Sequence, residues 1–322
     1  MKNESLNNKG TMAVLKRIWD SMGVWMICIL LFIALSCASD TFFSSTNLIN
    51  IVRQIAVTGI VALGATYVVL AGEIDLSQGG IVAFVGCGCA YMIVELGMNP
   101  AIAIAISILF GAVFMSLIGA VIAYLRVPSF IATLGLTYVM DGAVLLLTNS
   151  QPIPNLPSGF TAIARGYIAG VVPIAAVILL VAFIIGALAL RYTSFGRNVV
   201  AVGENKQAAK LSGINVEFIK VASFAIAGAC SALGGIVLAA RLGSGQPSSG
   251  SDVSLMALAA VFVGGASKGS VMNTLAGTLI IGMINNGLNQ IGLEAAWKSM
   301  ALGLIIIVAV ILDVARSRRL SK

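Results

Sequence analysis

Long stretches of uncharged, apolar residues recur along the whole chain, and they constrain the fold more than any other feature. An α-helix needs about 20 residues to cross the ~30 Å hydrocarbon core of a bilayer. Ten stretches approach that length, the eighth and tenth being short: 21–39, 54–72, 76–94, 100–125, 127–148, 167–190, 221–240, 253–267, 270–291 and 299–312. The sequence therefore predicts an all-α polytopic membrane protein with about ten transmembrane helices.

The composition leaves no room for a separate soluble domain, because 59% of the 322 residues are hydrophobic and only 10% are charged. We therefore expect a single transmembrane domain over residues 1–322. The first stretch is longer than the ~7 to 15 apolar residues of a signal peptide. It is interpreted as an uncleaved span that follows a polar leader at 1–20.

The distribution of the 19 lysines and arginines predicts the topology of this chain, whose net charge is +7. With the N-terminus inside, only Arg53, Arg165, Arg241 and Lys298 fall outside. The inner cations are Lys2, Lys9, Lys16, Arg17, Arg126, Arg191, Arg197, Lys206, Lys210, Lys220, Lys268, Arg316, Arg318, Arg319 and Lys322. By the positive-inside rule, both termini and the loop at 191–220 are cytoplasmic. The basic balance therefore requires no nucleic-acid partner.

Signatures of catalysis and metal binding are weak. The chain has no histidine, and its five cysteines all lie in apolar stretches. Cys87 and Cys89 point to nearly opposite sides of a helix, so a metal site is not expected. The pattern at 265–269 matches a hydrolase nucleophile elbow. Without histidine, only a pairing of Ser267 with Lys268 remains, and a tight turn is the favoured interpretation.

The chain also lacks a nucleotide-binding motif. No Gly-Lys dipeptide occurs, so a P-loop is absent. We expect no cofactor in this chain, and no ATP hydrolysis by that route.

Polar residues within the spans are candidates for a solute path, because ionisable side chains are costly in lipid. Asp141 lies deep in the fifth stretch. It either lines a pore, or is satisfied by a neighbouring helix, or marks a helix break at Gly142. Glu73 and Asp75 lie either in a plain inner turn or in broken backbone that dips into the membrane and lines a cavity.

Asn285 and Asn289 share one face of the ninth stretch, where their amides can bind a polar solute or join two helices. The predicted solute path is therefore Asp75, Asp141, Asn285 and Asn289, with broken or short helices around the pore.

A short polar helix is predicted in the charged loop, at GENKQAAKLSGIN (203–215). Glu204 or Asn205 caps it, it runs through Ser212, and Gly213 follows its end. Ala208 and Leu211 share an apolar face. A helix this short is unstable alone in water. It must dock, either on its own membrane domain or in a groove of a cytoplasmic partner.

Several motifs, in order, resemble the membrane subunits of bacterial ATP-binding-cassette importers for sugars, the ribose permease type within the branched-chain amino acid, ribose and galactose permease family. The motifs are GEIDLS (72–77), PSFIATLG (128–135), TNSQPI (148–153), TSFGR (193–197), AVGENKQAAKLSGINV (201–216), ALAAVFVGGAS (257–267) and NNGLN (285–289). The resemblance covers nearly the whole chain.

The resemblance implies that the short helix is the coupling helix that fits a cleft of an ATPase subunit. The residues it implies for that contact are Glu204, Asn205, Ala208, Ala209, Leu211, Ser212 and Gly213. It also implies a cassette ATPase that holds ATP and Mg, an extracytoplasmic solute-binding protein and a second permease chain. The location it implies is the bacterial cytoplasmic (inner) membrane.

The sequence departs from the family pattern at three places, and the two changes of charge leave the particular sugar open. Glu73 and Asp141 stand where the family commonly has glycine and arginine, and a glycine-rich insertion after Gly265 is shortened. The leading hypothesis is a translocation subunit for a small sugar or a sugar-like polyol or signal. Asp141 keeps an ion-coupled secondary transporter as the alternative.

Overall fold

The computed structural model describes residues 23–39, 41–265, 270–290, 292, 294, 296–297, 299–301, 303–304, 307–308 and 311. Helices dominate this part of the chain. A first apolar helix spans Gly23–Ala38. The remaining elements are α2 (Ser45–Leu70), α3 (Gln78–Val94), α4 (Pro100–Leu125), α5 (Ser129–Thr148), α6 (Ser158–Arg165), β1 (Tyr167–Ile168), β2 (Val172–Pro173), α7 (Ile174–Tyr192), α8 (Ser194–Glu204), α9 (Lys206–Leu211), α10 (Val216–Leu242), α11 (Val253–Gly264) and α12 (Val271–Gln290).

Six of the described helices are long and apolar enough to cross a membrane: α2, α4, α5, α7, α10 and α12. Three shorter apolar helices accompany them, Gly23–Ala38, α3 and α11. The eighth predicted span is indeed short, because α11 has 12 residues. The leader at 1–20 lies outside the described residues, as does much of the predicted span at 299–312, so the expected count of about ten stays a prediction.

Some predicted boundaries were wrong. The sixth span begins at Ile174 rather than Tyr167, because residues 167–173 form a small antiparallel hairpin. Gly170 turns this hairpin at φ +72°, and Pro173 immediately precedes the helix. The described part of the chain is therefore helical apart from this two-stranded hairpin. α2 starts nine residues before the predicted residue 54, and α10 starts at Val216 rather than 221.

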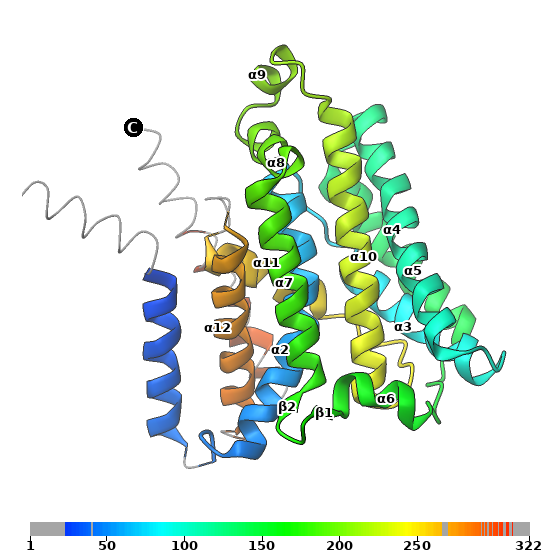
Figure 1. The fold of residues 1–322 in the computed structure, drawn as a ribbon, viewed down its shortest axis with the longest axis vertical. Helices are drawn as coiled ribbons and strands as arrows, with labels where there is room; N and C mark the ends of the chain where they lie inside the picture. The colour runs from blue at the N-terminus through cyan, green and yellow to red at the C-terminus, as the bar shows by residue number, and fades with distance from the viewer. Residues whose placement is uncertain are drawn as a thin grey trace, which may run out of the picture.

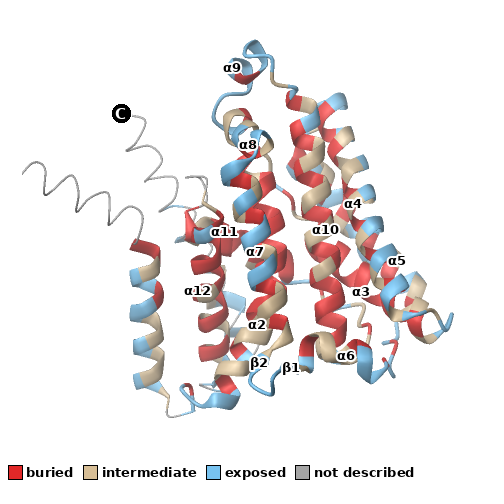
Figure 2. Cartoon of the chain, in the orientation of Figure 1, coloured by how far each residue is buried: buried red, intermediate tan, exposed pale blue. Residues whose placement is uncertain are grey.

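The core lies around α2, α3 and α10. α10 packs against α4, α2 and α3, and Figure 2 shows buried residues concentrated on these inner helices. In the most apolar stretch of α2, 67% of residues are buried, against 22% in α4 and in α5. Gly111 of α4 and Gly228 of α10 allow close approach, since a Cβ on either would collide with the other's backbone oxygen. The outer helices thus expose aliphatic faces.

The two ends of the helical bundle differ in character. α8 and α9 lie at one end, with α9 outermost, and α6 with the β1–β2 hairpin lies at the other (Figure 1). At this second end Arg53 Nη2 donates to the carbonyl of Arg165 at 2.6 Å, and Arg165 Nε donates to the carbonyl of Arg241 at 2.9 Å. Three of the four arginines and lysines expected outside therefore meet at one end, away from the loop expected in the cytoplasm.

Candidate functional site

Residues 71–77, between α2 and α3, form irregular backbone that runs inward along α5. The hydroxyls of Ser129 and Thr133 accept from the backbone N–H groups of Ile74 and Leu76, both at 3.2 Å, and Thr137 Oγ1 donates to the carbonyl of Leu76 at 3.2 Å. Because these three residues lie on successive turns of α5, the segment descends beside that helix. The backbone of residues 71–77 is thus broken and lies inside the bundle, whereas the expectation that Glu73 and Asp75 line a cavity stays a prediction.

A second irregular segment, residues 243–252, meets residues 71–77 inside the bundle. Residues 243–252 lead from the arginine end back into the bundle, and α11 starts there. Ser254 Oγ accepts from the N–H of Gly79 at 2.6 Å and donates to the carbonyl of Leu76 at 2.7 Å. Gly79 and Gly250 are in backbone contact that a Cβ on either would disrupt. The starts of α3 and α11 therefore touch, one reached from each end of the molecule.

Asp75 is only 1% exposed, at this junction. Its Oδ1 accepts from the N–H of Ser77 at 2.8 Å and from Ser77 Oγ at 2.6 Å. Its Oδ2 and both amide atoms of buried Gln78 have no partner among the described residues. Unpaired buried polar atoms are costly. Asp75 therefore lies inside the protein rather than on an open solute path in this conformation.

Glu73 takes a different direction from Asp75 and forms an ion pair with Lys220 of α10. Their side chains are 14% and 9% exposed. The nearby ammonium of Lys220, followed by burial, lowers the pKa of Lys206, the first residue of α9, and the carboxylates of Glu73 and Glu217 act in the opposite direction. Charges on α9, α10 and the inward-running segment therefore interact directly.

Asp141 lies on the exposed face of an unbroken α5. It makes no hydrogen bond or ion pair with any described residue. No described residue of another helix lies within 4 Å of a Cβ placed on Gly135 or Gly142 of α5. Within the described residues, α5 is unbroken at Gly142 and no neighbouring helix pairs with the carboxylate.

Asn285 lines a polar cavity of about 240 Å³ near the arginine end. The cavity walls also include Gln54 and Thr58 of α2, Arg241 of α10 and Asp252 before α11. Asn289, one turn further along α12, is exposed and does not line it. The four predicted path residues are thus separated: Asp75 is buried, Asp141 lies on the outer surface of α5, and only Asn285 lines this cavity.

Asn286, which sequence reasoning did not single out from its neighbours, also joins helices, beside Asn285, whose Nδ2 donates to Met256 Sδ of α11 at 3.7 Å. Asn286 and Asn47 of α2 exchange hydrogen bonds at 2.9 and 3.0 Å, and Gln290 Nε2 donates to Asn47 Oδ1 at 2.8 Å. The only available signal was its place one residue from Asn285, which puts it on a different face of α12.

The predicted short helix exists as α9. Asn205 caps it, with Oδ1 accepting from the N–H groups of Gln207 and Ala208 at 3.1 and 3.0 Å. Gly213 follows its end at φ +81°. Ala209 is buried, whereas Leu211 is 90% exposed and Ala208 is exposed. The helix therefore docks on its own domain through Ala209 and leaves Ala208 and Leu211 open.

α8 connects this helix to the inward-running segment. A Cβ on Gly203, near the end of α8, would collide with the carbonyl of Leu70 and approach the N–H of Gly72. Backbone at the end of α8 thus rests directly on backbone at the end of α2, where the segment begins. The Ser267–Lys268 pattern, by contrast, lies outside the described residues.

Comparison with known proteins decides the class. The family described as branched-chain amino acid transport system, permease component, matches residues 47–310. This chain belongs to that family. It is 38% identical to the ribose import permease protein of Bacillus subtilis (strain 168), over 97% of this chain and 98% of that protein.

Other relatives are also named as permease proteins for sugars. Identity to the ribose import permease protein of Escherichia coli (strain K12) is 37%, over 89% of this chain and 92% of that protein. The xylose transport system permease protein of Haemophilus influenzae is 32% identical, over 88% of this chain and 93% of that protein. No solved structure matches the chain. Together with its apolar helices, these relatives make it a multi-pass membrane protein of the transport permease class.

Proposed function

We propose that this chain is the translocation subunit of an ATP-binding-cassette importer for a small sugar or sugar-like polyol, energised by a separate cassette ATPase in the bacterial inner membrane. The relatives named for ribose and xylose support the solute class. The observation that carries the ATPase contact is α9, which is fixed to its own domain by Ala209 and offers Leu211, 90% exposed, on its other side. An exposed leucine on a docked helix is suited to a partner's groove.

In this proposal both termini and α9 are cytoplasmic, and closure of the ATPase moves α9. Two contacts carry that movement inward. Gly203 of α8 rests on the end of α2, and Lys220 of α10 holds Glu73. Both act on residues 71–77, whose far end meets the start of α11 through Ser254. Small shifts of α9 thus reach the centre of the bundle through packed contacts.

The solute path is proposed to lie against two surfaces of the chain. A carboxylate facing lipid is costly, so Asp141 on the exposed face of α5 requires water or protein beside it. A second permease chain packed near α5, with Asp141 lining the shared pore, meets that requirement. The polar cavity at Asn285 is the outer part of the path. An extracytoplasmic solute-binding protein delivers the solute and supplies most of the specificity.

Co-purification tests the ATPase contact. The tagged chain is solubilised from its native membrane in mild detergent, beside Leu211→Asp and a control, Val171→Asp. Val171 is also apolar and 74% exposed, but it lies in the hairpin at the other end of the molecule. We expect the ATPase with the wild type and the control and not with Leu211→Asp. Retention by Leu211→Asp, or no ATPase in any preparation, would contradict the proposal.

Proteoliposomes distinguish the ion-coupled alternative, which the relatives do not favour. The purified complex is reconstituted into vesicles, and its solute-binding protein and radiolabelled ribose or xylose are added to the external medium. We expect uptake that requires ATP on the side of α9. Uptake driven by a proton or sodium gradient, without the ATPase, would establish the alternative.

A further inference from the structure

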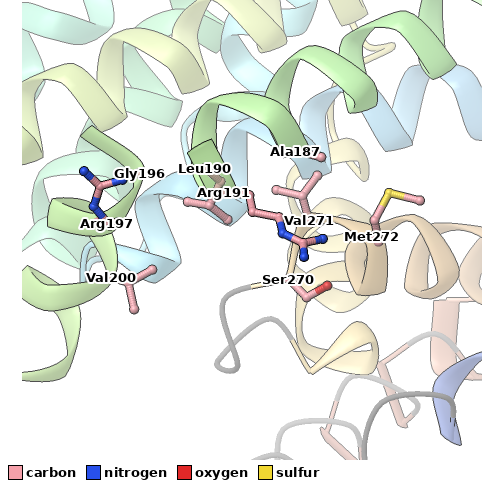
Figure 3. A pocket seen from close by; sticks show the side chains of 9 residues that line it. All are labelled: Ala187, Leu190, Arg191, Gly196, Arg197, Val200, Ser270, Val271 and Met272. Atoms are coloured by element: carbon pink, nitrogen blue, oxygen red, sulfur yellow. The ribbon is translucent and has the colours of Figure 1, made fainter. Parts of the chain in front are cut away.

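A pocket of about 530 Å³ lies at the inner end of α7, between that helix, α8 and the start of α12. Its walls combine two arginines, Arg191 and Arg197, with apolar side chains and Ser270. Figure 3 shows Arg191 extending from α7 toward Ser270, with Arg197 across the opening. The proposed transport function makes no use of this pocket.

The two arginines have no acidic partner within the part of the chain that the structure describes. The guanidinium of Arg191 lies over the ring of the adjacent Tyr192, 5.5 Å from its centre. Arginine presents a planar fork of donors that matches phosphate oxygens. The Ser270 hydroxyl supplies another donor on the opposite wall. A pocket with this charge is complementary to an anion.

The surroundings identify the kind of anion. From the pocket, the exposed side of α7 continues through Leu188, Ile184 and Leu180, each at least 50% exposed. These residues are spaced four apart and form one aliphatic stripe, with Arg191 and Tyr192 at its polar end. Tyrosine is typical of the membrane–water boundary. The pocket thus lies where a headgroup meets the hydrocarbon, and α9 extends farther from the bundle (Figure 1).

We propose that this pocket binds the phosphate headgroup of an anionic phospholipid of the same leaflet. The guanidinium of Arg191 and the hydroxyl of Ser270 hold the phosphate, and an acyl chain lies along Leu188, Ile184 and Leu180. Arg197 adds charge at the rim. The lipid joins the last turn of α7 to α8, the helix that rests on the end of α2. The inference requires membrane insertion only and does not depend on sugar transport.

Native mass spectrometry and thermal unfolding of the purified full chain test this site. The probes are phosphatidylglycerol, phosphatidylcholine and inorganic phosphate, and the variants are Arg191→Gln and Ser270→Ala. Arg126→Gln is the matched control, because Arg126 is an exposed arginine at the end of α4 outside the pocket. We expect phosphatidylglycerol to raise the melting temperature, and Arg191→Gln to weaken its binding about tenfold, as for a lost charged hydrogen bond.

Ser270→Ala is expected to weaken binding less, and Arg126→Gln to leave it unchanged. Equal loss in Arg191→Gln and Arg126→Gln would indicate general surface charge and overturn the proposal. Equal stabilisation by inorganic phosphate or phosphatidylcholine would do the same. If Arg191→Gln leaves lipid binding unchanged and instead prevents ATPase co-purification, the pocket is a protein contact and the lipid assignment is wrong.

Discussion

Breaking the Glu73–Lys220 ion pair should strongly destabilise the chain. Glu73→Gln removes the carboxylate and leaves the Lys220 ammonium, only 9% exposed, without a countercharge. Loss of one partner of a buried ion pair costs about 3–5 kcal/mol. Both side chains keep some contact with solvent, so we expect the lower end, about 3 kcal/mol.

The double variant Glu73→Gln with Lys220→Met provides the sharper test. Replacing a buried pair with neutral side chains of similar size is often nearly neutral. Most of the lost stability should therefore return, so the double variant should cost clearly less than the sum of Glu73→Gln and Lys220→Met measured singly. The free energy of unfolding is measured by circular dichroism during titration of mixed micelles with sodium dodecyl sulfate.

The control for this cycle is Glu95→Gln, which removes an exposed carboxylate at the other end of α3. It should change the free energy of unfolding by less than about 0.5 kcal/mol. The ion pair does not hold the segment if Glu73→Gln lowers the free energy of unfolding no more than this control does. The same follows if the loss in the double variant equals the sum of the losses in the two single variants.

Four further predictions concern other sites. Gly250→Ala should cost about 1–3 kcal/mol by overpacking against the carbonyl of Gly79; Gly97→Ala, with nothing within 4 Å but φ +62°, measures backbone strain alone, and equal costs would refute the contact. Asn286→Leu should cost about 2 kcal/mol in the same titration by removing the two hydrogen bonds that Asn286 exchanges with buried Asn47, which keeps its bonds to Phe42 and Gln290, and a neutral result would contradict this. Asp141→Asn should reduce uptake without reducing expression, and unchanged uptake would exclude a pore role. The lowered pKa of Lys206 makes the unfolded chain bind more protons between that value and 10.5, so stability should rise with pH across this window; Lys206→Gln should lose that rise, and an identical profile in the variant would refute the effect.

Local signals in the sequence predicted α9 well. Asn205 and Gly213 are a cap and a stop whose action depends only on neighbouring backbone. Which side of α9 packs against the rest of the domain was not predictable in the same way. Ala208 and Ala209 are adjacent and chemically identical, and only packing against the rest of the domain decides that Ala209 is buried. Ala209→Asp would therefore disturb the docking of α9 on its own domain, whereas Leu211→Asp changes only an exposed side chain.

The inward-running segment could be predicted only as one of two alternatives. Its backbone is satisfied by Ser129, Thr133 and Thr137, which lie more than 50 residues away in the sequence. The start of α7 was mispredicted although a local signal existed. Pro173 cannot donate a backbone hydrogen bond and is favoured next to a helix start, whereas the apolar residues 167–172 masked that boundary. Asp141 is exposed and makes no hydrogen bond or ion pair with a described residue, so its role stays a prediction.

Ser254 links the two irregular segments, residues 71–77 and 243–252, that enter the bundle from opposite ends. Its hydroxyl group accepts from the N–H of Gly79 and donates to the carbonyl of Leu76. Its own helix, α11, begins directly after residues 243–252, which come from the end of the molecule that contains Arg241. If residues 71–77 shift along α5, α11 must follow or both hydrogen bonds of Ser254 must break. A shift of one segment would then be passed to the other, and Ser254→Ala would leave only the backbone contact between Gly79 and Gly250 to pass it on.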